Sequence, residues 1–218
     1  MNRNKVVIVL CVVFSIVTGI FAKDLVVGGT ILATGLLCAY FASVGKRSNY
    51  LYGFVNYLFM GYVSFKNHLY GIFFAYLFLF APLQIHGYIK WNKNLDEEEN
   101  VIARGFTFKN SILIIGSCLV GSLFVGFLLT LIPGQRLAYL DATSNCINLC
   151  GVLLLNLRFK EAWWLWLVNN IIDLSIWVIT TMNHGEGAVM MLLVSIGYLL
   201  INIYGIVKWN KEMEKGEK

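Results

Sequence analysis

The side chains best able to do chemistry lie inside an apolar stretch of the sequence. Asp173 falls near the middle of the apolar run 162–182, with Asn169 and Asn170 one helical turn earlier and Trp166 one turn before those. Residues three and four apart share one face of a helix, so this run predicts a polar stripe. Carboxamides donate and accept hydrogen bonds, a carboxylate offsets positive charge, and an indole stacks on rings. The stripe is suited to binding a small, polar, ring-containing molecule.

Other polar side chains also occur within apolar runs. Asp141, Asn145 and Asn148 follow at helical spacing in the run 139–159, whereas Gln84 and Asn202 each lie seven residues before a tryptophan. A carboxylate at the centre of a bilayer costs roughly 2.5–3.5 kcal/mol on insertion scales, so a carboxylate there is expected to face a cavity. The alternative role for the amides is hydrogen bonding between helices, worth about 0.6–2 kcal/mol each.

We predict one binding site for these side chains, with no catalytic residue, metal ligand or cofactor. The predicted substrate-binding residues are Asn56, Gln84, Asn145, Asn148, Trp166, Asn170, Asp173 and Asn202. The five cysteines all fall within apolar runs without neighbouring His or Cys ligands, so they are interpreted as packing residues. The sequence also lacks a Gly-rich phosphate loop, which argues against nucleotide hydrolysis.

The elements that must position this site are membrane-spanning helices. Of the 218 residues, 58% are hydrophobic and 13% are charged, whereas about a quarter are charged in soluble domains. Apolar helices of about 20 residues span a bilayer, so the composition predicts an all-α integral membrane protein in contact with lipids. The net charge of +5 comes from basic residues scattered through short loops, which argues against a nucleic-acid partner.

Eight apolar runs indicate eight transmembrane helices. They cover approximately 6–22, 25–44, 50–65, 69–91, 111–132, 139–159, 162–182 and 187–209. The first run has no convincing cleavage site after it and is interpreted as a retained span. Pro82 is expected to kink the fourth run. Of the 17 Lys and Arg residues, all but Lys23, Lys66 and Arg136 fall on the side that carries both termini. Basic loops face the cytoplasm, so we expect cytoplasmic termini in a multi-pass protein of a bacterial cell membrane.

The fourth and eighth runs end in nearly the same tetrapeptide, which indicates an internal repeat. Residues 90–93 (KWNK) recur as 208–211, each preceded by a glycine four residues before its tryptophan. Further upstream an offset of 114 pairs Tyr50 with Trp164 and Asn56 with Asn170. The two tetrapeptides are interpreted as anchors at the membrane interface.

The repeat predicts a single membrane domain with 3+1+3 architecture. Its parts are an extra N-terminal span (6–22), repeat 1 (25–91), a loop and connector span (92–138), repeat 2 (139–209) and a tail (210–218). One connector span between two three-span units makes the repeats parallel, as in sugar transporters of the SWEET type. The acidic stretch 96–99 is interpreted as part of a solvated cytoplasmic linker.

The sequence resembles the PnuC family of vitamin transporters over the second to eighth runs. The resemblance rests on Gln84-x-x-Gly87-x-x-x-Trp91, on Trp164-x-Trp166-x-x-x-Asn170 within an aromatic stretch that begins at Trp163, and on Gly205-x-x-x-Trp209. It implies a SWEET-like fold and facilitated diffusion of nicotinamide riboside, with a cytoplasmic kinase that phosphorylates and traps the vitamin. It also implies that the chain can form a homotrimer. Asn169 and Asp173 depart from the family pattern, which leaves the substrate open.

Several other functions remain compatible with the residues. Relatives within the resemblance carry thiamine, riboflavin or deoxynucleosides, and a SWEET-type sugar carrier is a further alternative. A membrane assembly factor that transports nothing is an alternative from another class. The cationic ring of nicotinamide riboside, its carboxamide and its ribose suit Asp173, Trp166 and the predicted amides. The sequence therefore favours a vitamin nucleoside bound between two repeats.

Overall fold

The fold is a bundle of helices that cross from one end of the molecule to the other. The computed structural model describes residues 3–97, 99–105 and 108–216. The helices are α1 (Arg3–Phe21), α2 (Val27–Ser43), α3 (Asn49–Lys66), α4 (Tyr70–Ala75), the π-helix η1 (Tyr76–Phe80), α5 (Ala81–Asn92), α6 (Phe108–Thr130), α7 (Ala138–Asn156), α8 (Ala162–Met182) and α9 (Ala188–Gly216). Because α4, η1 and α5 follow without a break, they form one span, and the described residues form the eight spans predicted.

Most of these spans have the length and composition of membrane helices. Six of the described helices are long and apolar enough to cross a bilayer: α1, the α4–α5 span, α6, α7, α8 and α9. The helix α2 is apolar but only 17 residues long. The helix α3 has 18 residues and is less apolar, because polar side chains such as Asn49 and Asn56 lie on its buried face.

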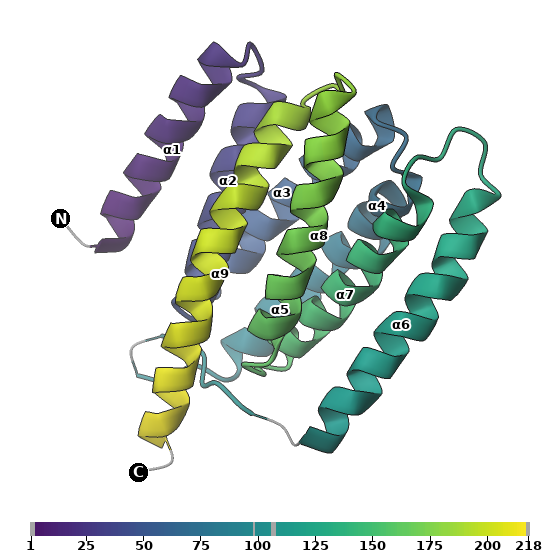
Figure 1. Ribbon diagram of the computed structural model, residues 1–218. Helices are drawn as coiled ribbons and strands as arrows, with labels where there is room; N and C mark the ends of the chain where they lie inside the picture. Colours follow the sequence, from purple (N-terminus) through teal and green to yellow (C-terminus); the bar gives the residue numbers. More distant parts are fainter. Residues whose placement is uncertain (1–2, 98, 106–107, 217–218) are drawn as a thin grey trace.

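Six of the eight spans form a closed ring. Contacts run from α2 to α3, from α3 to the α4–α5 span, from this span to α7, then to α8, α9 and back to α2. The two remaining helices lie at the margins, with α1 against α2 and α6 against α7 (Figure 1). Both chain ends lie at the same end of the bundle, which we call the termini end, and the opposite end is the far end (Figure 1).

Two tryptophans close the interior of the ring at the termini end. Trp91 is 0% exposed and donates its Nε1–H to the backbone oxygen of Leu155 at 3.0 Å. Trp209 is 1% exposed and donates to the backbone oxygen of Ala42 at 3.3 Å. The prediction that they are interfacial anchors is therefore wrong, because both indoles are buried within the protein and hydrogen-bonded to another helix.

A glycine beneath an aromatic ring explains how each tryptophan is buried. A Cβ atom on Gly87 would lie 2.2 Å from the ring of Tyr50, and one on Gly205 would lie 2.5 Å from the ring of Trp163. The ring centroids of Tyr50 and Trp91 are 5.0 Å apart, and those of Trp163 and Trp209 are 5.9 Å apart. Trp163 thus packs against a glycine and a tryptophan as Tyr50 does, whereas Trp164, the predicted counterpart of Tyr50, is 54% exposed.

Polar side chains close the far end. The carboxylate of Asp141 on α7 is buried and accepts hydrogen bonds from the backbone N–H of Gly71 at 3.0 Å and from Nε2 of Gln135 at 2.8 Å. On the other side of the ring, Nδ2 of Asn67 donates to the backbone oxygen of Glu186 at 2.8 Å. The far end is therefore held by directional hydrogen bonds between spans that are distant in sequence.

Candidate functional site

The ring of six spans encloses a cavity. Every member of the ring contributes lining residues, whereas none of the described residues of α1 or α6 does. The empty volume is about 750 Å³, including the part that is open to solvent. Small-molecule sites often lie between the helices of a bundle, which is where this cavity is found.

The cavity collects most of the predicted binding residues. Six of the eight line it: Gln84, Asn148, Trp166, Asn170, Asp173 and Asn202. The other two, Asn56 and Asn145, do not belong to the lining. The prediction of a common polar site therefore agrees with the positions of residues from the α4–α5 span, α7, α8 and α9.

Asn56 and Asn145 lie outside the cavity lining, where Asn56 bonds other helices and Asn145 bonds a residue of its own helix. Nδ2 of Asn56 donates to the backbone oxygen of Ile31 at 2.9 Å, and its Oδ1 accepts from the hydroxyl of Tyr198 at 3.1 Å. Nδ2 of Asn145 donates to Oδ1 of Asp141 at 2.7 Å. Asn56 thus orients Tyr198, which does line the cavity, and Asn145 belongs to the polar network of the far end.

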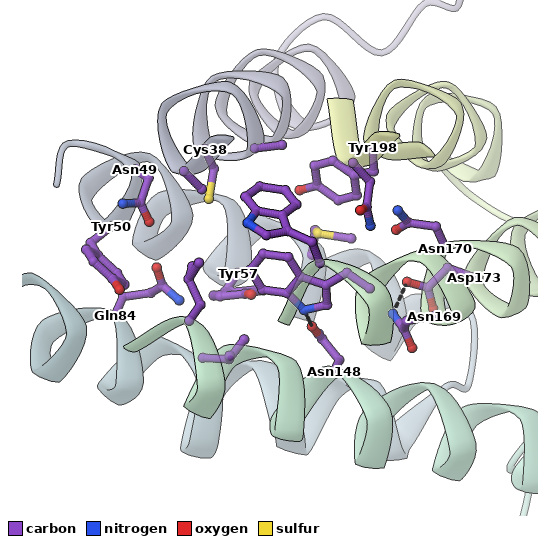
Figure 2. A pocket seen from close by; sticks show the side chains of 18 of the residues that line it. Cys38, Asn49, Tyr50, Tyr57, Gln84, Asn148, Asn169, Asn170, Asp173 and Tyr198 are labelled. Carbon is purple, nitrogen blue, oxygen red and sulfur yellow. Dashed lines mark hydrogen bonds between the residues drawn. The ribbon is translucent and has the colours of Figure 1, made fainter. Parts of the chain in front are cut away.

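One part of the cavity carries its carboxylate. Oδ1 of Asp173 accepts from the hydroxyl of Ser144 on α7. Its Oδ2 accepts from Nδ2 of Asn169 at 2.8 Å (Figure 2). Asn169 precedes Asp173 by four residues, so regular α-helix places them on one face of α8. Asn170 lies beside this pair (Figure 2). This carboxylate end is formed by Ser144, Asn169, Asn170 and Asp173.

The opposite part of the cavity is polar but carries no acid. Figure 2 shows Asn49, Tyr50 and Gln84 together on the side away from Asp173. Asn156 and Trp163 also line the cavity, and Nδ2 of Asn156 donates to the backbone oxygen of Leu83 at 3.1 Å. This amide end is formed by residues of α3, α5, α7 and α8.

Aromatic rings lie between the two polar ends. Tyr57 appears between them in Figure 2. The indole of Trp166 donates to Oδ1 of Asn148 at 3.1 Å and meets the ring of Trp163 edge to face, with centroids 5.3 Å apart. The rings of Tyr57 and Tyr76 are 5.1 Å apart. The walls therefore offer aromatic surface to a ring and polar atoms at either side of it.

Several polar atoms around the cavity are buried without a hydrogen-bond partner. They are the Tyr50 hydroxyl, Oδ1 of Asn156, Nε1 of Trp163, Oδ1 of Asn169, and both Nδ2 and Oδ1 of Asn202. A buried donor or acceptor that stays unpaired costs about 1–3 kcal/mol. Their concentration around one cavity indicates a site built to be satisfied by a guest molecule or by water.

The charge of the lining favours some guests over others. Among the described residues that line the cavity there is no Lys, Arg or His, and Asp173 is its acid. A phosphate group is normally met by basic side chains or by helix N-termini. The lining is therefore better matched to a neutral or cationic molecule than to an anion.

Sequence reasoning missed several lining residues, and some of them had a detectable signal. Tyr198 lies four residues before Asn202, and Asn156 lies eight after Asn148, so each shares a helix face with a predicted residue. Cys38, interpreted as a packing residue, also lines the cavity. Asn49 and Tyr50 start a helix next to a basic turn, where polar residues are ordinary, so their role carried no signal.

Comparison with known proteins places the chain in a family. A family profile described as nicotinamide mononucleotide transporter matches residues 26–211. The nicotinamide riboside transporter PnuC of Neisseria mucosa is 31% identical over 202 residues, which cover 90% of this chain and 76% of that protein. The PnuC of Haemophilus influenzae is 30% identical, covering 84% of this chain and 78% of its own length.

This chain belongs to the PnuC family. A crystal structure titled as the vitamin B3 transporter PnuC superposes with a TM-score of 0.86 at 28% identity, covering 99% of this chain and 93% of that one. PnuC proteins are membrane transporters and not enzymes. The chain is therefore a multi-pass membrane transporter with an all-helical PnuC fold.

Proposed function

We propose that this protein carries nicotinamide riboside across a bacterial cell membrane by facilitated diffusion. The curated relatives named above support this substrate because they are nicotinamide riboside transporters. The observation that carries the proposal is the cavity itself, with a carboxylate end, aromatic walls and an amide end. Its predicted contact residues remain Gln84, Asn148, Trp166, Asn170, Asp173 and Asn202, to which we add Asn169 and Asn156.

The chemistry of the ligand matches the two ends of the cavity. Nicotinamide riboside has a cationic pyridinium ring with a carboxamide, joined to a ribose with hydroxyl groups. Asp173 offsets the positive charge, and the aromatic walls stack on the ring. The amides of Gln84 and Asn156 both donate and accept, as ribose hydroxyls require. The cationic ring of thiamine makes that vitamin the second candidate.

The charge of the lining favours the riboside over the mononucleotide. The family profile carries the name of the mononucleotide, whose phosphate is an anion. In this cavity the phosphate would lose its hydration with no Lys, Arg or His among the described lining residues. Burying an unpaired anion is strongly unfavourable. Only the riboside is therefore expected to bind well.

Alternating access is proposed to arise from two similar halves, α2–α5 and α7–α9. The backbone supports this division, because residues with positive φ recur before and after corresponding helices. Lys23 (54°) precedes α2 and Leu137 (51°) precedes α7, whereas His68 (57°) and His184 (55°) follow α3 and α8. Non-glycine residues seldom adopt this conformation, so its recurrence at matched positions favours duplication.

The tryptophan contacts support the same division. Trp91 of the first half bonds the end of α7 in the second half, and Trp209 of the second half bonds the end of α2 in the first. Such reciprocal contacts are expected of parallel repeats related by an axis along the membrane normal. In this proposal α1 is the extra span, α6 is the connector, and one half rocks against the other around the cavity.

The orientation follows from the loops. The basic residues concentrated at the termini end favour a cytoplasmic location of that end. Phosphorylation of the imported riboside by a cytoplasmic kinase would keep the cytoplasmic concentration of free riboside low. Its concentration gradient would then stay directed inward without energy input by the transporter. The homotrimer implied by the family resemblance stays a prediction.

Counterflow in proteoliposomes tests the substrate. Vesicles loaded with unlabelled nicotinamide riboside should accumulate the labelled riboside, thiamine should compete more weakly, and the mononucleotide should not compete. Equal competition by the mononucleotide would contradict the proposal. So would the absence of counterflow for the riboside.

The reduced riboside tests the role of the carboxylate, because reduction removes the positive charge of the ring and keeps its carboxamide and ribose. The wild type should prefer the oxidised form, and Asp173→Asn should abolish this preference. Asp24→Asn is the matched control, since it removes a carboxylate that lies outside the cavity lining. A preference that survives Asp173→Asn would exclude Asp173 as the cation-binding group.

A further inference from the structure

The segment between α5 and α6 crosses the termini end of the bundle and bonds two distant turns. We call the described residues 94–97 and 99–105 the strap. The N–H of Val101 donates to the backbone oxygen of Gly45, between α2 and α3, at 2.8 Å. The N–H of Arg104 donates to the oxygen of Arg158, and the N–H of Lys160 donates to the oxygen of Arg104, at 2.7 and 2.8 Å. One segment therefore holds the α2–α3 turn and the α7–α8 turn together.

The two turns occupy corresponding places in the proposed halves. Gly45 and Arg158 each lie two residues beyond the end of the first helix of their half, and both have positive φ, 74° and 70°. Contacts from the strap to both points resist separation of the halves at this end. The strap is thus placed to oppose the rocking on which the proposed transport rests.

Val101 covers the termini end of the cavity. Its side chain is 3% exposed and belongs to one apolar cluster with Ala42, Tyr50, Leu155 and Trp163. These four residues also line the cavity. Val101 therefore belongs to the same buried apolar cluster as part of the cavity wall, although it comes from a segment outside the ring.

The strap has an internal structure of its own. Leu95 and Val101 form an antiparallel bridge, the N–H of Asp96 donates to the oxygen of Asn100 at 2.8 Å, and the N–H of Asn100 donates to Oδ1 of Asp96 at 2.7 Å. The side chain of Arg104 lies over the ring of Phe159, 5.1 Å from its centroid. The acidic stretch that was interpreted as a solvated linker therefore includes a carboxylate that stabilises a turn. A segment with such internal bonds is able to detach as a unit.

We propose that the strap is the gate at the termini end of the transporter, with Val101 as its plug. Substrate passes between the cavity and this side of the membrane only after the strap has released the α2–α3 turn. The gate is held by a few backbone hydrogen bonds, the contact of Arg104 with Phe159 and the burial of Val101, which suits an element that must open and close repeatedly. The inference rests on the proposed transport function.

A cross-link between the strap and the α2–α3 turn tests the gate. A Cβ atom on Gly45 would lie 3.7 Å from Cβ of Asn100, within the range of about 3.5–4.5 Å found in disulfides. In the double variant Gly45→Cys/Asn100→Cys, diamide takes two electrons and two protons from the paired thiols and becomes the hydrazine, while the disulfide forms. Each single variant and the wild type, treated identically, control for oxidation of native cysteines.

The cross-linked protein should bind nicotinamide riboside and fail to exchange it. We expect counterflow to fall by at least about tenfold after oxidation and to recover after reduction with dithiothreitol, because a closed gate blocks each transport cycle. Binding in detergent should change little. Undiminished counterflow in protein whose cross-link is verified by mass would overturn the gate. Absence of counterflow in the wild type would instead reject the proposed function.

A second measurement remains informative if the cysteine variants do not fold. The native thiol of Cys38 lines the cavity, one helical turn from Ala42. A membrane-impermeant maleimide supplied at the termini end should label Cys38 several-fold faster in Val101→Ala than in the wild type, with Cys38→Ser as the blank. Equal labelling rates in the two proteins would show that Val101 does not cover the cavity.

Discussion

The two ends of the ring are closed by different chemistry. At the far end a buried carboxylate, a glutamine and an asparagine bond backbone groups of neighbouring spans. At the termini end the rings of Tyr50 and Trp163 pack on glycines, in one apolar cluster with Trp91, Trp209 and a valine from the strap. Hydrogen bonds to a carboxylate are directional and leave unpaired groups when they break, whereas apolar contacts weaken gradually with distance. The far end therefore depends on a few atoms, and the termini end on a broad surface.

The largest expected effect comes from removal of the far-end carboxylate. Asp141→Ala leaves the N–H of Gly71 without its acceptor and removes one of the two acceptors of each side-chain amide of Gln135 and Asn145. Because each buried group left unpaired costs about 1–3 kcal/mol, we expect the free energy of unfolding to fall by about 3 kcal/mol or more. Thermal unfolding in detergent measures it.

The first half of the chain offers a matched control for this variant. Asp24 is half-buried and accepts one hydrogen bond, from the N–H of Gly28 at 2.9 Å. Asp24→Ala should therefore cost only about 1 kcal/mol. Equal losses in the two variants would mean that the far end does not depend on Asp141 in particular.

The next effect concerns the tight packing of the termini end. Gly87→Ala and Gly205→Ala would place a methyl group against the rings of Tyr50 and Trp163. Overpacking of this kind costs about 1–3 kcal/mol, and both variants should lower the midpoint of thermal unfolding. Gly116→Ala is the control, because a Cβ atom there meets no neighbour. If all three variants behaved alike, helix propensity and not packing would explain the result.

A smaller effect is expected from the indole hydrogen bonds. Trp91→Phe and Trp209→Phe keep an aromatic ring but leave the backbone oxygens of Leu155 and Ala42 without these donors. Each should cost about 1 kcal/mol and speed counterflow, since both bonds hold the termini end closed. Initial counterflow rates and thermal midpoints measure both effects. Similar rates and midpoints for the two variants would support the equivalence of the two halves. An effect confined to one tryptophan would contradict that equivalence.

The smallest effect is expected at the surface of the far end. Lys66 and Glu186 form an ion pair of 3.7 Å with side chains 44% and 65% exposed. Glu186→Gln should therefore change the free energy of unfolding by less than about 0.5 kcal/mol. Asn67→Ala removes a partly buried hydrogen bond to the backbone oxygen of Glu186, and should lower the free energy of unfolding by about 1 kcal/mol. The reverse order would show that surface charge contributes more to this closure than buried amides.

Hydropathy predicted the eight spans well, because the length and polarity of a membrane helix depend only on a continuous stretch of sequence. The sequence also singled out polar residues such as Asp173 and Gln84, which line the cavity, because a polar group within a membrane is costly unless it faces protein or water. Their role as substrate contacts stays a prediction. Their exact environment was less accessible. Asn56 is as buried and polar as Asn170, yet it faces Tyr198 behind the wall and not the cavity.

The errors arise from contacts between distant segments. Trp91 lies in a basic, aromatic sequence that is typical of membrane interfaces. Its burial depends on another helix, where its indole donates to the backbone oxygen of Leu155. The glycine four residues earlier was a usable signal of close packing. The pairing of Tyr50 with Trp164 stays a prediction. The ring that lies against a glycine as that of Tyr50 does is Trp163, and periodicity does not indicate this because it fixes a helix face and not the register between two helices.

The π-helix η1 has a consequence for the length of its span. Tyr76 and Gln84 both line the cavity although eight residues separate them, which exceeds two α-helical turns by about one residue. The wider π turn takes up that extra residue, and Pro82 lies two residues after its end. Losing or gaining one residue here would rotate everything after it by about 100° and carry Gln84, Gly87 and Trp91 away from their partners. This lipid-facing stretch therefore tolerates exchange of its exposed side chains, such as Phe78, but not a change in their number.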